Sequence, residues 1–527
     1  MSKIKYRVND QSRVLLADML PYETPFIFSN VGFFKWYTNY QNGHISKVAR
    51  SYLEEIALSP AIGQTIPYHF SINRSGGGQL QLSVIHPRSQ VRFINFYRQY
   101  DSLITNQCSK SQYSIRFPKS RHAEYIRNHD PNHRKPRPGD PVDVEAEDFD
   151  VEQLYPHTYF VYGGYNLLYK FFESAQFFRI EKRFSHGLSF DISKCFFNIY
   201  THTIAWAVKS KAFAKKYRNA TNFEREFDDS IQCANYKETN GIPVGPEVSR
   251  IFAEIILQEV DRNVENILNE RGFRLNDDYV VVRYVDDYYI FVHDVRQAYI
   301  IKSVFEQELL NYKLFINGEN SKNSFTIPQF SSICKVDCCK NISDLFDLLF
   351  YKENGTTSPK YISRPLLVTK NVIKRIKEAA LLGGATISGS AARVLFQIRD
   401  KLEEHLGQEH EKVIRDTEGS NIGSVFEVII ELSTFFVCHA YKAQPLVAFS
   451  HILLILRDEV RHYDETTRES VRTRLIEEFN QMFLSTPDAD PFSIERLNSL
   501  LLIRELDHEM LFKDKRFSQI FVELKKN

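Results

Sequence analysis

The chain has 527 residues and a mass of 61.7 kDa, enough for two to four domains with ample buried core. Hydrophobic residues at 43% and charged residues at 25% are typical of a soluble globular protein. We find no apolar run of about 18 residues, no signal peptide and only seven scattered cysteines, so we expect a cytoplasmic protein that does not enter a membrane. The net charge of +1 does not favour a groove that grips long nucleic-acid duplexes.

The first part of the chain alternates short strands and helices. Residues 67–73 and 80–87 flank Gly76–Gly78 and predict a hairpin; a phosphate loop is excluded because no Lys-Ser/Thr pair follows the glycines. Residues 114–119 form a short segment with two cations, Arg116 and Lys119, which are candidates for neutralising phosphate charge or are simply surface residues.

A single acid, Asp191, ends a short apolar stretch that starts at Ser189. Phe196 follows five residues after Asp191. It is either an ordinary core aromatic or, because of this offset, a residue of the same functional site as the acid. Downstream, Gly and Pro break the chain across Asn240–Gly245, and an apolar helical pattern then starts near Ile251.

Two apolar strands within Tyr279–Val292 meet at a tight acidic turn, Asp286–Asp287. An Asp-Asp pair is often only a solvated turn. Here, however, Asp191 stands about a hundred residues upstream, and three carboxylates from two neighbouring strands can hold two Mg²⁺ ions about 3.5–4 Å apart. Mn²⁺ is the alternative ion. The sequence therefore predicts a two-metal site for phosphoryl transfer.

These segments resemble motifs A, B and C of reverse transcriptases, of which the third is the Tyr-x-Asp-Asp box at Tyr284–Asp287. A later segment, Leu314–Lys322, resembles motif D, and residues 114–119 resemble the basic fingers segment that contacts the triphosphate. The resemblance implies catalytic roles for Asp191, Asp286, Asp287 and Lys322, metal ligation by Asp191, Ile192, Asp286 and Asp287, and nucleotide binding by Phe196, Arg116, Lys119, Pro243, Gly245 and Tyr284.

Within the family, the ring at Phe196 excludes a ribose 2′-hydroxyl, and Lys322 protonates the leaving pyrophosphate unless it is only a lysine at a strand end. Motif B departs from the usual pattern. Most templated members carry Pro-Gln-Gly where this chain has Pro243-Val244-Gly245. Without this amide the loop lacks a hydrogen-bonding group near the nascent base pair, which argues against ordinary template reading.

Beyond about residue 345, apolar residues recur at helical spacing and strand signals are scarce. We expect an α+β reverse-transcriptase-like fingers and palm region over 1–345, with the palm core at about 185–345. An all-α, helical-repeat (HEAT-like) domain follows over 346–527. A ribonuclease H domain is excluded, because it needs a sheet that carries several acids.

The opening Leu15–Pro25 and the Val-containing motif B resemble bacterial defence reverse transcriptases, and the two-part architecture is similar to the abortive-infection (Abi) polymerases. That resemblance implies template-independent synthesis from deoxynucleoside triphosphates, primed by a tyrosine hydroxyl, with single-stranded DNA left attached to a homo-oligomeric protein. The 28 tyrosines do not identify the primer. Two alternatives stay open: a templated enzyme that copies a noncoding RNA, and a non-catalytic scaffold that binds nucleic acid.

Overall fold

The computed structural model describes residues 3–5, 10–58, 63–74, 78–121, 124–126, 158–217, 222–318, 323–327, 332–353, 356–382, 387–406, 419–484 and 493–506. One predicted site residue, Lys322, lies outside these ranges. The chain divides into two compact units. Unit 1 comprises 1–24, 28–69 and 82–328, and unit 2 comprises 25–27, 70–81 and 329–527.

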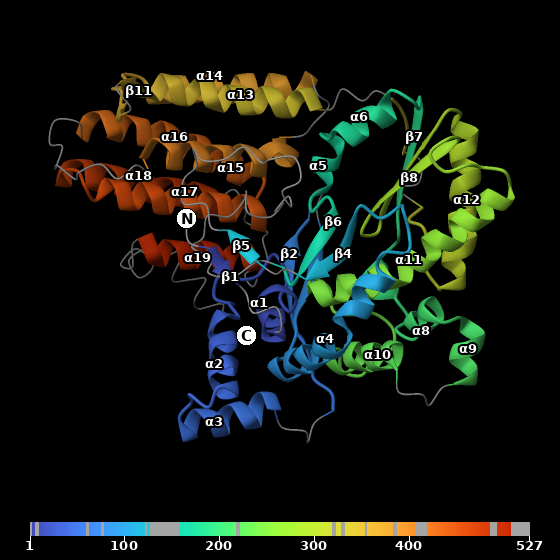
Figure 1. Cartoon of the computed structure of the whole chain (residues 1–527). Coiled ribbons are helices and arrows are strands. Elements are labelled where there is room, and N and C mark those ends of the chain that lie inside the picture. Colours follow the sequence, from blue (N-terminus) through green and yellow to red (C-terminus); the bar gives the residue numbers. More distant parts are fainter. Residues whose placement is uncertain are drawn as a thin grey trace. The chain divides into compact units, whose positions relative to one another are not determined.

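Unit 1 combines short strands with helices that pack around them (Figure 1). Its strands are β1 (Lys3–Lys5), β4 (Arg116–Arg121), β5 (Glu124–Ile126), β6 (Phe160–Gly164), β7 (His186–Asp191), β8 (Tyr279–Tyr284), β9 (Asp287–Val292) and β10 (Asn323–Thr326). Its helices are α1 (Val14–Ala17), α2 (Val31–Gln41), α3 (Lys47–Leu53), α4 (Pro87–Gln107), α5 (Leu168–Phe172), α6 (Ala175–Glu181), α7 (Cys195–Asn198), α8 (Thr203–Val208), α9 (Lys211–Lys216), α10 (Phe223–Ala234), α11 (Glu247–Glu270) and α12 (Val295–Asn311).

The centre of unit 1 is a four-stranded antiparallel sheet in the order β10-β7-β9-β8. Alternate side chains of the β8–β9 hairpin face opposite sides, as the period of two in a strand requires. Val281 and Ile290 enter the main core beside α11 and α12, whereas Val282 and Phe291 join a smaller cluster with α5 and α6. Both faces of the central strands are therefore buried, which explains why the run reads as continuously apolar.

Aromatic packing joins the sheet to α12. The rings of Phe190 and Tyr288, neighbours on β7 and β9, stack with centroids 4.9 Å apart and an interplanar angle of 6°. Phe305 of α12 packs against both rings at 5.5 and 4.8 Å. All three side chains are almost fully buried, so this contact fixes the sheet on its helical layer.

The predicted hairpin is confirmed: β2 (Tyr68–Asn73) pairs with β3 (Gln79–Val84). Its central residues, 70–81, are counted in unit 2. There the Asn73 N–H donates to Glu495 Oε1 at 3.0 Å, and the Asn73 side-chain amide donates to the Tyr441 carbonyl at 3.2 Å. A local hairpin thus takes part in the folding of a unit whose other residues come mainly from much later in the chain.

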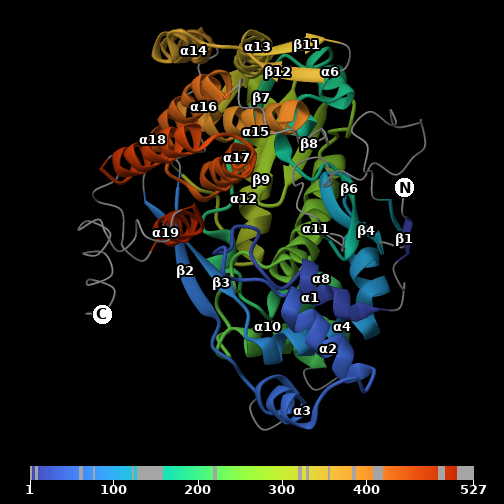
Figure 2. The same ribbon diagram turned by 90° about the vertical axis from the view of Figure 1, so that its left-hand side faces the viewer.

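Unit 2 is mainly helical, with one short hairpin of β11 (Phe350–Glu353) and β12 (Thr356–Pro359). Two rows of helices pack together, α13-α15-α17 and α14-α16-α18, and α19 contacts α17 (Figure 2). Their bounds are α13 (Ser332–Leu349), α14 (Pro365–Leu382), α15 (Ile387–Leu406), α16 (Gly419–His439), α17 (Ala443–Val460), α18 (Glu465–Leu484) and α19 (Ile494–Leu506). A boundary at 345/346 would cut α13, whose Ile342 and Phe346 share one core with the following helices. The HEAT-like assignment stays a prediction.

One apolar helix segment in the described part of the chain, Asn421–His439 of α16, is long enough to cross a membrane, with a mean hydropathy of 1.5. Of this segment, 61% is buried inside the protein. A buried core helix passes the same length and composition test, so this segment is only weak evidence for a membrane span.

Candidate active site

The register of the central sheet brings two acids together. Asp191 ends β7 and lies directly opposite Asp287, the first residue of β9. Side chains opposite each other in an antiparallel pair have Cβ atoms about 4.5–5.5 Å apart. Asp286 lies in the turn just before Asp287, and its carbonyl accepts the Ile192 N–H at 3.3 Å. The three predicted acids therefore lie at one end of the sheet, where β7 ends and β9 begins.

Burial and mutual repulsion make these carboxylates difficult to ionise together. Burial raises the pKa of Asp287 to about 7, and the charges of Asp286 and Asp191 act in the same direction. Burial also raises the pKa of Asp286, with a further contribution from the charge of Asp191. Like charges held close raise one another's pKa, so a bound cation would reduce the repulsion between these carboxylates.

The carboxylate oxygens and their mutual repulsion suit a hard divalent cation, although the three acids do not form a complete set of metal ligands. Carboxylate oxygens are the donors that Mg²⁺ prefers. Within the described ranges, no three His, Cys, Asp or Glu side chains are arranged as a ready-made metal site. Ile192 is buried beside the acids, and its predicted role as a ligand stays a prediction.

The turn before the acid pair has a strained backbone. Val285 has φ 57°, in the left-handed region that β-branched residues rarely adopt. Arg283 donates through Nη1 to the Val285 carbonyl at 3.0 Å. On the other side of the turn, the hydroxyl of Tyr284 donates to the Asn166 carbonyl. Hydrogen bonds thus hold the peptide that presents Asp286 and Asp287 in an otherwise unfavourable conformation.

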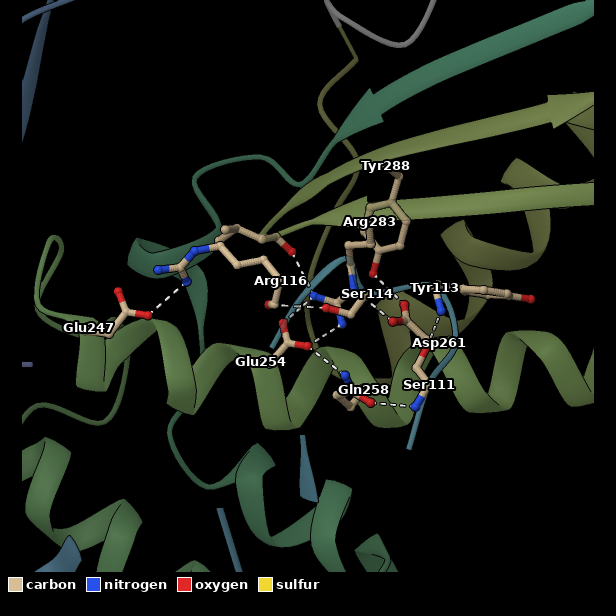
Figure 3. Close-up of polar contacts among 11 residues, drawn as sticks. Ser111, Tyr113, Ser114, Arg116, Glu247, Glu254, Gln258, Asp261, Arg283 and Tyr288 are labelled. Carbon is tan, nitrogen blue, oxygen red and sulfur yellow. Dashed lines mark hydrogen bonds and ion pairs between the residues drawn. The ribbon is translucent and has the colours of Figure 1, made fainter. Parts of the chain in front are cut away.

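Arg283 is fully buried and pairs with two acids of α11 (Figure 3). Its Nη1 and Nη2 donate to the Glu254 carboxylate at 2.6 and 3.1 Å, and its Nε donates to Asp261 Oδ2 at 2.8 Å. Asp261 also accepts the Tyr288 hydroxyl at 3.0 Å. Glu254 and Asp261 are seven residues apart and therefore lie on one face of the helix. We call Arg283, Glu254, Asp261 and Tyr288 the buried ion cluster.

The cluster also joins a third segment of unit 1. Gln258 donates to Glu254 at 2.7 Å and accepts the Ser111 N–H at 2.5 Å. The main chain of Arg283 makes two hydrogen bonds to this segment. Its N–H donates to the Tyr113 carbonyl at 2.7 Å, and its carbonyl accepts the Ile115 N–H at 2.9 Å. The segment before β4 is thereby fastened to β8, the strand that precedes the turn at Val285.

Arg116, predicted to bind triphosphate, forms an ion pair here. Its buried Nη1 donates to Glu247 Oε1 at 2.8 Å, and its guanidinium lies 4.3 Å from the centre of the Tyr162 ring. Arg250 binds the other Glu247 oxygen at 3.0 Å. Burial raises the pKa of Glu247, but the charges of Arg116 and Arg250 lower it to about 2. These four residues line a pocket that also touches Val285, so the ion pair lies close to the turn before Asp286.

The other fingers candidate, Lys119, is exposed at an irregularity in β4. Pro118 pairs with Tyr162 and Ser120 with Val161, which leaves Lys119 as the extra residue of the bulge. Its side chain is accessible to a ligand, whereas its assignment to a nucleotide stays a prediction.

The motif B loop lies against the segment that follows Asp191. The Phe196 carbonyl accepts the Ile242 N–H at 2.9 Å, and Phe196 is half-buried against the core. Pro243 is buried, and Gly245 has φ 113°, where an added Cβ would lie 2.7 Å from Pro21 Cβ. Only glycine allows this close approach. The structure therefore brings Phe196 next to the loop that carries Pro243 and Gly245, two other residues predicted to bind the nucleotide.

Sequence reasoning missed Asn317 and the buried ion cluster. The Asn317 N–H donates to the Asp191 carbonyl at 2.9 Å, and its amide nitrogen lies 3.3 Å from Asp191 Oδ2. A charged Arg283 inside an apolar strand, with two acids seven residues apart on the preceding helix, was a signal for a buried ion pair. Asn317 had no comparable signal, because its contact depends on the bridge between Ile192 and Ile316.

Residues 86–331 match the family described as reverse transcriptase (RNA-dependent DNA polymerase). This part of the chain is a reverse transcriptase domain, and the protein is a nucleotidyltransferase. No curated protein sequence matches the chain.

Solved telomerase structures show weak similarity. Telomerase from Candida albicans, in complex with the TWJ fragment of telomeric RNA, is 11% identical with a TM-score of 0.32, over 89% of this chain and 67% of that one. Apo telomerase from Candida tropicalis is 12% identical with a TM-score of 0.31, over 97% and 75%. The assignment of the domain depends on the sequence match, because these TM-scores are low.

Replacing Arg283 tests whether its bond to the Val285 carbonyl positions the acids. Arg283→Lys keeps a buried charge but loses the planar fork, so we expect unfolding to cost about 3 kcal/mol less. The Mg²⁺ concentration for half-maximal nucleotide incorporation should rise at least about tenfold, because the turn loses its anchor. Tyr288→Phe is the matched control: it removes one bond to Asp261 at about 1 kcal/mol and should leave the Mg²⁺ requirement unchanged. An unaltered requirement in a folded Arg283→Lys protein would contradict the positioning role.

The raised pKa of Asp287 predicts a pH-dependent stability in metal-free protein. The folded state binds this proton up to about pH 7, whereas an ordinary Asp loses it near 3.8, so stability falls as pH rises between these values. The free energy of unfolding of Asp287→Asn should therefore exceed that of wild type by about 1–2 kcal/mol at pH 8 in EDTA, and this gain should be smaller at pH 5. Glu270→Gln, which removes an exposed acid from the end of α11, controls for net charge. Equal gains from both variants at pH 8 would refute carboxylate crowding.

Proposed function

We propose that this protein is an antiphage defence DNA polymerase that works without a template and starts DNA from a tyrosine hydroxyl. The polymerase part of the proposal depends chiefly on one observation: the register that places Asp191 opposite Asp287, with Asp286 in the adjoining turn. The defence role, the protein primer and the Abi-type assignment are supported by the resemblance of Leu15–Pro25 and of the two-part architecture.

In this proposal Asp191, Asp286 and Asp287 hold two Mg²⁺ ions, with the Ile192 carbonyl as a further ligand. When bound, the ions activate the attacking hydroxyl and neutralise the leaving pyrophosphate. The buried ion cluster keeps the turn at Val285 in place while the acids change their charge state. Preorganised geometry of this kind lowers the barrier because no rearrangement is needed during reaction.

The other predicted residues surround the incoming nucleotide. Phe196 lies under the sugar, Pro243 and Gly245 form the loop beside it, and Tyr284 supports the turn. Lys119 and Arg116 neutralise the triphosphate, for which Arg116 exchanges Glu247 for a phosphate oxygen. Lys322 supplies the proton to the leaving group.

One sequence feature supports synthesis without a template: Val244 stands where most templated members carry a glutamine, so the loop lacks that hydrogen-bonding amide. The loop is also held in place, because the Val244 carbonyl accepts the Ser83 N–H at 2.9 Å and Gly245 packs against Pro21. The buried hydroxyl of Tyr288 is bonded to Asp261, which argues against this tyrosine as the primer. A homo-oligomeric, cytoplasmic assembly with a HEAT-like second domain completes the proposal.

A templated enzyme that copies a dedicated noncoding RNA is the second candidate. It is favoured by the matched family, whose description is an RNA-dependent DNA polymerase. The two candidates differ in one respect that can be measured directly, namely the dependence of synthesis on RNA that copurifies with the protein.

The test uses purified protein, Mg²⁺ and labelled deoxynucleotides without primer or template, with nuclease-treated samples in parallel and products separated on a denaturing protein gel. We expect label that migrates with or above the protein and is absent from Asp286→Ala and Asp287→Ala, because each loses a metal ligand. Glu270→Gln serves as a control that should keep full activity. Label that requires the retained RNA would support the templated enzyme, and label in the folded Asp287→Ala protein would refute this site.

Phe196→Ala tests the proposed sugar gate. Removal of the ring makes room for a 2′-hydroxyl, so incorporation of ribonucleotides relative to deoxynucleotides should rise at least about tenfold. Phe197→Ala is the matched control, because Phe197 is the exposed neighbour in the same short helix. Unchanged sugar selectivity in Phe196→Ala would place the gate at another residue.

A further inference from the structure

The segment that follows Asp191 has an unusual charge. Residues 192–223 contain six Lys and Arg residues and no Asp or Glu, in a chain whose net charge is only +1. At the average of 66 acids in 527 residues, a stretch of 32 residues would hold about four. A positive surface therefore begins next to the predicted catalytic acid, although the whole chain is nearly neutral.

Helix α9 presents this charge together with aromatic rings. It buries none of its six residues, so it contributes almost nothing to the core. Phe213 is 42% exposed and Tyr217, which caps the helix, is 48% exposed, and their ring centroids are 4.6 Å apart. Lys215 and Lys216 are exposed beside them. Two adjacent rings exposed to water beside lysines form a candidate binding surface.

Neighbouring residues repeat the pairing of a lysine with an aromatic ring. Lys211 lies 4.6 Å from the Trp206 ring of α8, and Lys313 lies 4.1 Å from the Tyr200 ring. Tyr200 is nine residues beyond Asp191, and Lys313 is four residues before Asn317, which bonds Asp191. We define the lysine–aromatic surface as Tyr200, Lys211, Phe213, Lys215, Lys216 and Tyr217.

We propose that the lysine–aromatic surface binds the single-stranded DNA that the active site produces; the proposal rests on the proposed function. Lysines neutralise backbone phosphates, and exposed rings stack on unpaired bases whatever their identity. Paired bases are already stacked on each other, so the rings favour a single strand over a duplex. A surface of this kind holds a growing product near the acids without reading its sequence.

The test measures binding separately from synthesis. Fluorescence anisotropy with a labelled oligodeoxynucleotide of about 30 nucleotides is recorded in EDTA without deoxynucleotides, using the full chain. Charge reversal in Lys211→Glu/Lys215→Glu/Lys216→Glu should weaken binding at least about tenfold and flatten the salt dependence by about 0.7 per lost phosphate contact. Phe213→Ala/Tyr217→Ala should weaken binding at least about fivefold with little change in salt dependence.

A matched control reverses three exposed, dispersed lysines, in Lys35→Glu/Lys47→Glu/Lys182→Glu, and should bind almost as wild type does. Equal weakening by this control would show that net charge alone is responsible and would overturn the surface. Tighter binding of duplex DNA, or of RNA of the same length, would overturn the assignment to single-stranded DNA. Binding through this surface by a protein that synthesises nothing would refute the proposed function alone, and active synthesis with unaltered binding in the variants would refute the surface alone.

Discussion

The buried ion cluster around Arg283 is the interaction on which the geometry of unit 1 depends. A guanidinium and two carboxylates are removed from water, which is unfavourable unless each charge has partners. Here the Arg283 nitrogens reach both acids of α11 and the Val285 carbonyl, so the desolvation is offset by hydrogen bonds. The helix α11, the strand β8 and the turn at Val285 are thereby joined at one side chain.

This anchoring matters because the neighbouring acids repel one another. Asp286 and Asp287 both have raised pKa values from burial and from nearby negative charge. Without a constraint, repulsion would favour a relaxed turn with the carboxylates apart. The bond from Arg283 to Val285 holds the unfavourable φ of the turn, so stability from the core is used to maintain strain at the site.

The remainder of unit 1 divides into parts that support the core and parts that do not. Arg116 pairs with Glu247 and its guanidinium packs against the Tyr162 ring, so this buried ion pair belongs to the supporting part. Helix α9 is the opposite case, since none of its residues is buried. Its lysines and rings are exposed to solvent, and for this reason we propose a role in binding for them.

Local pattern in the sequence predicted much of this protein. The apolar run with Asp286 and Asp287 predicted a hairpin and its acidic turn, and the helical stripes predicted unit 2, because both signals depend on neighbouring residues. Only the tertiary structure decided that Asp191 pairs with Asp287, that Arg283 reaches Glu254 on α11, and that residues 70–81 are counted in unit 2. Those contacts join residues far apart in the chain, and their energies come from packing and desolvation that no local pattern records.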